Sequence, residues 1–164
     1  MSPVYVVGSE QGHRTPPWLF RLCQSLVGQP FALDAFADAE SALCAKWYGV
    51  TDDGLQQPWR DPTFANPPFR LLGQVVGKAV AEWRGRRRVR TVLLGPVGCS
   101  QRWLHELWPW ATVYWPDKRI TYLDPQGRAT LGAMQDSAVY VIGNNKKPHD
   151  EPVVRVLRVR EAGA

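Results

Sequence analysis

Apolar residues recur along the first half of the chain with two alternating spacings. A helical spacing covers residues 17–27, which begin at a proline and stop before Gly28, and helix-forming residues fill 39–47 and 71–83. Short apolar runs separate these segments and are typical of strands. The expected strands are residues 30–36, 62–66 and 89–95. Strands and helices in alternation predict a parallel α/β sheet with crossover helices.

The second half of the chain is mostly strand. One more helix is expected over residues 101–108. The strand candidates that follow are residues 111–115, 119–123, 137–143 and 153–159. Apolar residues alternate with arginines in the last of them, which indicates a strand with one solvated face. We expect these strands to extend the sheet in a partly antiparallel way, giving a Rossmann-like α/β fold flanked by helices. The β-branched run 4–7 is either a further strand or an extended entry.

Length and charge narrow the class of protein. The 164 residues fit one domain, 1–164, and the 20 basic against 15 acidic residues give a net charge of +5. This balance fits a polyanionic partner but does not require one. Cys23, Cys44 and Cys99 lie far apart, as do the three histidines, so we expect no metal site. With no signal peptide and no membrane-spanning run, we expect a cytoplasmic protein that is not bound to a membrane.

The sequence Asn66-Pro67-Pro68-Phe69 directly follows the expected strand 62–66. Two prolines in succession remove backbone donors and hold the chain extended. The result is a short rigid loop that offers an amide side chain, a proline carbonyl and an aromatic ring. In an open α/β sheet, ligands bind at the carboxyl ends of the strands, where this loop is expected. As a simpler alternative, the loop is a turn that ends the strand and buries Phe69.

Six segments in this order carry a resemblance to a known family. They are RTPPWLF (14–20), FALDAFAD (31–38), DDGLQQPW (52–59), FANPPF (64–69), RWLHEL (102–107) and DKRITY (117–122). Together they resemble the short Dam-like DNA N6-adenine methyltransferases of bacteriophages and prophages, from about residue 13 to residue 143. The resemblance implies a Rossmann-like methyltransferase sheet, S-adenosylmethionine as cofactor, and double-stranded DNA whose target adenine is flipped out of the helix. No insertion is long enough for a separate target-recognition domain, so we expect the specificity to be short, relaxed or supplied by a homodimer partner.

The resemblance also assigns residues. Asn66, Pro67, Pro68 and Phe69 match the catalytic loop. The cofactor-binding positions are Thr15 and Pro16, then Asp34, Ala35 and Phe36 after the first strand, then Asp52 and Asp53. Three features depart from the family pattern. The glycine-rich form of the first turn is absent, Phe69 stands where tyrosine is commoner, and the segment between LDAF and DDGL is too short for a helix, a full strand and a second helix. The ribose-binding residue stays open between Asp38 and Glu40.

Basic residues on the later segments are the expected contacts to nucleic-acid phosphates. They are Arg102, Lys118, Arg119 and Arg128. The arginine cluster at 84–90 is expected to be a solvated turn at the opposite end of the strands. Two other functions stay open: methylation of RNA or of a protein amide by the same loop, and a non-catalytic nucleic-acid-binding module of the same fold. Binding of S-adenosylmethionine separates the module from the enzymes.

Overall fold

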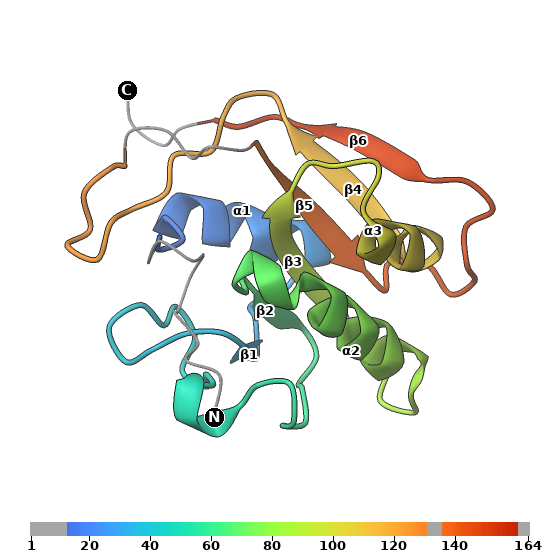
Figure 1. Ribbon diagram of the computed structural model, residues 1–164, viewed down its shortest axis with the longest axis horizontal. Helices are drawn as coiled ribbons and strands as arrows, with labels where there is room; N and C mark the ends of the chain where they lie inside the picture. Colours follow the sequence, from blue (N-terminus) through green and yellow to red (C-terminus); the bar gives the residue numbers. More distant parts are fainter. Residues whose placement is uncertain (1–12, 131–135, 161–164) are drawn as a thin grey trace.

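The computed structural model describes residues 13–130 and 136–160, which contain a six-stranded sheet (Figure 1). The strands lie in the order β1-β2-β3-β5-β4-β6. Their bounds are Leu33–Asp34 (β1), Thr63–Ala65 (β2), Thr91–Pro96 (β3), Ala111–Pro116 (β4), Ser137–Ile142 (β5) and Val153–Leu157 (β6). Because β5 lies between β3 and β4, the last strands of the chain extend the sheet that the first strands begin.

The sheet is mostly parallel. β1, β2 and β3 pair in parallel, and β4 pairs in parallel with β6. β5 is antiparallel to both of its neighbours, β3 and β4. Five strands therefore point the same way and place their carboxyl ends at one edge of the sheet, which we call the carboxyl edge. The opposite, amino edge receives the end of β5.

Helices cover both faces of the sheet. Helix α1 (Pro17–Val27) packs on one face, and α2 (Leu72–Arg84) with α3 (Arg102–Leu107) packs on the other (Figure 1). Each lies where the sequence pattern predicts it. The described residues also form three short 3-10 helices, at Val50–Asp52 (η1), Phe69–Leu71 (η2) and Trp108–Trp110 (η3). No helix in the described ranges is both long and apolar enough to cross a membrane.

The strand side chains alternate between two cores. On β3, Val92 and Leu94 belong to the α1 core, whereas Leu93 belongs to the α2/α3 core. On β5, Val139 and Val141 face α1 while Tyr140 packs on the other side, against α3 through Trp103. Burial of both faces explains why these strands are continuous apolar runs in the sequence. The two cores fix the sheet, and with it the ends of β1 and β2.

Two expected elements are absent from the structure, and a third lies outside the described residues. Residues 39–47 were predicted to be helical, but Asp38 accepts hydrogen bonds from the amides of Glu40 and Ser41, and the chain turns instead. It then runs extended beside β1, where Asp34 bonds the backbone of Lys46 and Tyr48. Residues 119–123 were predicted to be a strand; they form only isolated bridges, at Leu123. The predicted segment 4–7 is outside the described part of the chain.

Candidate active site at the carboxyl edge

The carboxyl ends of β1 and β2 bring together the two segments with the strongest expected chemistry. Asp34 pairs with Phe64 in parallel register, so that the chain after Asp34 runs alongside the chain after Phe64. The amide of Ala35 donates to the carbonyl of Phe64 over 2.9 Å. The turn at 34–37 and the loop at 66–69 therefore leave the sheet side by side.

Asn66 is held by a residue from the start of the described chain. Its Nδ2 donates a hydrogen bond of 3.0 Å to Oγ1 of Thr15, and only 6% of the residue is exposed. The described residues donate no hydrogen bond to Asn66 Oδ1. The residue expected to carry catalysis thus contacts a residue expected to bind the cofactor. Pro16, the neighbour of Thr15, is buried and caps α1.

The two prolines are buried, but the aromatic ring after them is not. The Pro68 carbonyl accepts the amide of Leu71, which starts the chain into η2 and α2. The Pro67 carbonyl accepts no hydrogen bond from the described part of the chain. Phe69 is 38% exposed. The simpler alternative of a turn that buries Phe69 is therefore wrong about the ring.

Asp34 is a buried carboxyl group at the end of β1. It is 4% exposed, and burial raises its pKa to about 7, although the amide of Phe36 donates to its Oδ1 and opposes this rise. Asp38 behaves differently, because hydrogen bonds from Ser41 hold its pKa below the usual range in spite of partial burial. Of the two residues considered for ribose binding, Asp38 is thus engaged by its own turn. The other, Glu40, forms an ion pair of 2.9 Å with Arg14 and is largely exposed.

Gly54 joins the 52–59 segment to the end of β1. A Cβ atom on Gly54 would lie 2.3 Å from the carbonyl oxygen of Ala35, so no other residue fits without a shift of the backbone. The carbonyl of Gly54 accepts the indole N–H of Trp59, which packs edge-on against Phe36. In the sequence, this segment was singled out only by the family resemblance. The pattern of apolar and polar residues did not predict that Gly54 packs closely against Ala35.

The two acidic residues before Gly54 are bound within their own loop. Asp52 accepts the amide of Gly49 through Oδ2 over 2.8 Å, and Asp53 accepts the amide of Leu55 through Oδ1. Asp53 has φ of 51°, a left-handed conformation that aspartate tolerates better than most residues. Both carboxylates therefore lie on a rigid turn beside Ala35.

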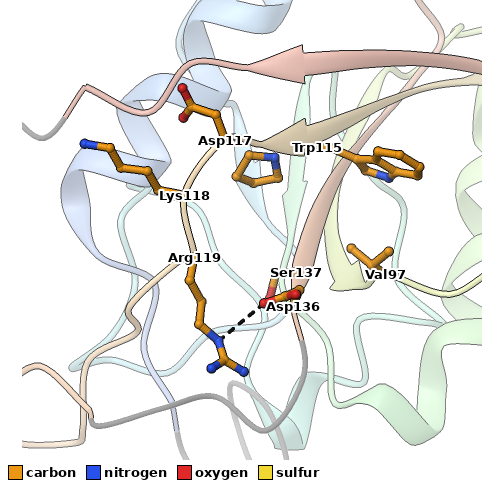
Figure 2. A pocket seen from close by; sticks show the side chains of 8 residues that line it. Val97, Trp115, Asp117, Lys118, Arg119, Asp136 and Ser137 are labelled. Atoms are coloured by element: carbon orange, nitrogen blue, oxygen red, sulfur yellow. Dashed lines mark ion pairs between the residues drawn. The ribbon is translucent and has the colours of Figure 1, made fainter.

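A pocket of about 370 Å³ opens further along the carboxyl edge, where β3, β5 and β4 meet (Figure 2). It is lined by Val97, Trp115, Pro116, Asp117, Lys118, Arg119, Asp136 and Ser137. Trp115 is 49% exposed, and Figure 2 shows its ring and Val97 on the same side of the pocket. Arg119 forms an ion pair of 3.3 Å with Asp136. Trp115 was not singled out from the sequence, where it was only the last residue of an expected strand.

The four expected phosphate contacts do not form one cluster. Lys118 and Arg119 line the pocket, whereas Arg102 lies on α3 and Arg128 in the segment after Asp124. Arg102 pairs with Glu106 over 3.2 Å, and Arg128 pairs with Asp124 over 2.8 Å. All four are exposed, but acidic partners offset the charge of three of them.

The described fold is that of a Rossmann-like methyltransferase: a mostly parallel six-stranded sheet covered on both faces, with polar groups at the carboxyl edge. A family model of DNA N-6-adenine-methyltransferase (Dam) matches residues 8–157, and the chain belongs to this family. It is also similar to the Escherichia coli (strain K12) protein named "Putative methyltransferase YfdM". The two are 36% identical over 63 residues, which cover 34% of this chain and 68% of that protein.

Proposed function

We propose that this protein methylates the exocyclic amino group of adenine in DNA, with S-adenosylmethionine as the methyl donor and the 66–69 loop as the catalytic loop. The family supplies the reaction class and the DNA substrate. The observation that carries the proposal is the position of Asn66: buried at the carboxyl end of β2, with Nδ2 bound to Thr15 and Oδ1 without a described donor.

Two acceptors from the loop suit the chemistry of an amino nitrogen. The lone pair of the adenine amino group is delocalised into the ring, which makes the nitrogen a poor nucleophile. In the proposed mechanism, Asn66 Oδ1 and the Pro67 carbonyl each accept one hydrogen of this amino group. The two hydrogen bonds draw the nitrogen towards tetrahedral geometry. Because both groups are fixed before the substrate arrives, they act by preorganisation.

The polar groups near the loop fit the proposed cofactor. When bound, S-adenosylmethionine supplies an electrophilic methyl group on a positively charged sulfur. Carboxylates and hydroxyls are suitable partners for its ribose hydroxyls and its positive charges. The residues proposed to hold it are Thr15, Pro16 and the 34–36 turn, with Asp52 and Asp53. Asp34 is the most buried carboxyl of this set.

The target adenine must leave the base stack to reach a buried Asn66. Extrusion of a paired base costs roughly a few kcal/mol, and stacking on an aromatic ring recovers about 1–3 kcal/mol. Phe69 is the proposed stacking surface, which its exposure permits. We expect the recognition sequence to be short, relaxed or supplied by a homodimer partner, since none of the segments that connect the strands is long enough for a separate recognition domain.

Methyl transfer is tested with labelled S-adenosylmethionine and DNA, RNA or protein, followed by mass spectrometry of the product. N6-methyladenine in DNA alone supports the proposal, whereas label in RNA or protein contradicts the substrate. Asn66→Ala should lower kcat by about 10²–10³-fold and leave the Kd of the cofactor nearly unchanged. Asn144→Ala, at an exposed asparagine beyond the end of β5, is the matched control. Calorimetry without measurable cofactor binding would instead favour a non-catalytic module.

A further inference from the structure

Two basic segments that are far apart in the sequence lie together at the amino edge of the sheet. The turn 85–90 connects α2 to the start of β3, and β5 ends beside it because Thr91 pairs with Ile142. The next residue, Gly143, packs against α2: a Cβ atom there would lie 2.8 Å from the ring of Trp83. Residues 144–147 therefore leave the sheet next to the end of α2.

The short helix η3 contacts both the end of α2 and the segment that follows β5. The guanidinium of Arg84 lies 5.3 Å from the ring centre of Trp110, and the amide of Gly143 donates to the Trp110 carbonyl over 3.1 Å. The carbonyl of Pro109 accepts Nδ2 of Asn145 over 3.3 Å. These contacts give the two segments a fixed relative position.

Six exposed cations result from this arrangement, and we call them the amino-edge patch. They are Arg84, Arg86, Arg87, Arg88, Lys146 and Lys147. Within the described ranges, none of the six forms an ion pair. Two neighbouring acids are already paired, Asp61 with Arg90 and Glu82 with Lys78, and Asp150 and Glu151 follow Lys147 along the chain.

The patch differs from the carboxyl edge in the ion pairing of its cations. Arg102, Arg119 and Arg128 each have an acidic partner, although they were the expected phosphate contacts. Arginine suits phosphate recognition because its planar fork donates several hydrogen bonds. Arg84 on Trp110 and Arg88 on Trp83, both at 5.3 Å, are partly ordered by the rings beneath them. Less ordering entropy is then lost when a phosphate binds.

We propose that the amino-edge patch binds the phosphate backbone of nucleic acid without regard to sequence. The inference rests on the proposed function for the class of partner, since a DNA substrate is what makes a polyphosphate the expected ligand. The composition of the patch supports this class over a protein or a membrane surface. Among the described residues, the exposed large apolar side chains are Phe69, Val97, Trp115, Val154 and Val156, and none lies in the patch. A surface that is charged but not apolar suits a polyanion.

The patch acts at a distance from the proposed chemistry. β3 is six residues long, which separates the two edges of the sheet by about 20 Å. Phosphates bound at the patch therefore do not position the target base. We expect the patch to raise the affinity for all sequences alike and to leave kcat unchanged, as an anchor that keeps DNA near the enzyme.

The test compares two triple variants of the full chain with equal loss of charge. R86Q/R87Q/K146Q removes half of the patch, and R21Q/R155Q/R160Q removes three exposed arginines from elsewhere, so that both lower the net charge from +5 to +2. Binding to a labelled duplex of about 30 base pairs is measured between about 50 and 200 mM salt. The patch variant should bind more weakly, and its slope of log K against log salt should be shallower by about one for each lost phosphate contact. The control variant should keep the wild-type slope.

Three results would overturn the inference. Wild-type affinity and slope in the patch variant would show that the patch does not touch DNA. Equal losses in both variants would show an effect of net charge alone. A larger loss of binding to phosphatidylserine vesicles or to polyglutamate than to the duplex would assign the patch to another class of partner. Methyl transfer is measured separately: a wild-type protein that binds DNA through the patch but methylates none contradicts the proposed function and leaves the patch standing.

Discussion

The amide of Asn66 and the hydroxyl of Thr15 form a hydrogen bond of 3.0 Å that joins positions 51 residues apart. An asparagine side chain has a donor end and an acceptor end. With Nδ2 engaged by Thr15, the acceptor Oδ1 is directed elsewhere, as the proposed contact to an amino group requires. We therefore propose that Thr15 positions Asn66 in the loop, in addition to its expected contact with the cofactor.

Replacement of Thr15 tests this positioning role. Thr15→Val keeps the shape of the side chain but loses the acceptor for Asn66 Nδ2, and we expect kcat to fall about 2–10-fold, the value of one neutral hydrogen bond. Thr15→Ser restores a hydroxyl and should recover most of the rate. Single-turnover kinetics with saturating DNA isolates the chemical step. A valine variant with the kcat of wild type, or a serine variant as slow as valine, would contradict the role.

Gly54 provides a test of how the 52–59 segment fits against β1. Gly54→Ala places a methyl group 2.3 Å from the Ala35 carbonyl, so the turn must move and carry Asp52 and Asp53 with it. We expect a loss of about 1–3 kcal/mol in the free energy of unfolding and weaker cofactor binding. Gly77→Ala is the matched control, because a Cβ there meets nothing within 4 Å and the site lies inside α2. That variant should gain about 0.5–1 kcal/mol. Urea denaturation and calorimetry give both quantities.

Asp34 should make the stability of the protein fall as the pH rises. Its pKa is about 7 in the folded protein because of burial, whereas the unfolded chain has the usual value near 4. Between these values the folded state holds a proton that the unfolded state has lost. The free energy of unfolding therefore decreases from about pH 4 to about pH 7, by at most about 1.4 kcal/mol per pH unit from this group.

Asp34→Asn should remove this decrease, since an amide stays neutral throughout. Asp117→Asn is the control, because the amide of Val159 and then Arg158 lower the pKa of Asp117, so that its contribution is lost only as the pH falls through the acid range. Denaturation curves at several pH values between 4 and 8 separate the two variants. If wild type and Asp34→Asn showed parallel profiles over this window, Asp34 would not hold a proton in the folded state.

The elements that the sequence predicted correctly are those whose side chains pack into the two apolar cores. Apolar spacing predicted α1 at its observed bounds, and the apolar runs predicted β3 and β5, because burial on both faces selects apolar residues at successive positions. The prediction failed where local polar bonds compete with propensity. Residues 39–47 contain good helix formers, yet Asp38 caps a turn there and the backbone of Lys46 and Tyr48 pairs with Asp34. Such pairing depends on a partner that no local pattern reveals.

The candidate site also has some features that the sequence predicted and others that it did not. The Asn-Pro-Pro-Phe motif and its place after β2 follow from the order of residues, and the family comparison agrees with the reaction class. The contact between Asn66 and Thr15, the fit of Gly54 against Ala35 and the ion pair of Arg119 with Asp136 are long-range properties. They required the three-dimensional arrangement. The amino-edge patch is the clearest case, since Lys146 and Lys147 join the arginine turn only because β5 runs antiparallel.

The last prediction concerns Phe69 and tests base flipping itself. A stacking surface needs a flat ring, which tyrosine keeps and leucine lacks. Phe69→Tyr should therefore retain activity, while Phe69→Leu should lose about 1–3 kcal/mol of affinity for an extruded base. The loss should be smaller on a duplex whose target adenine is already mismatched, because extrusion then costs less.

The exposure of Phe69 separates this role from a structural one. At 38% exposed, the ring contributes little to the core, so Phe69→Leu should leave the Tm nearly unchanged. Phe64→Leu supplies the contrast: Phe64 is 1% exposed and packs against Phe20 and Phe31, and its truncation should cost at least about 1 kcal/mol and lower the Tm. Melting curves and methylation rates on paired and mismatched duplexes are measured for both variants. Equal activity losses on the two duplexes, together with a fall in Tm for Phe69→Leu like that of Phe64→Leu, would mean that the ring supports the fold and that another surface receives the flipped base.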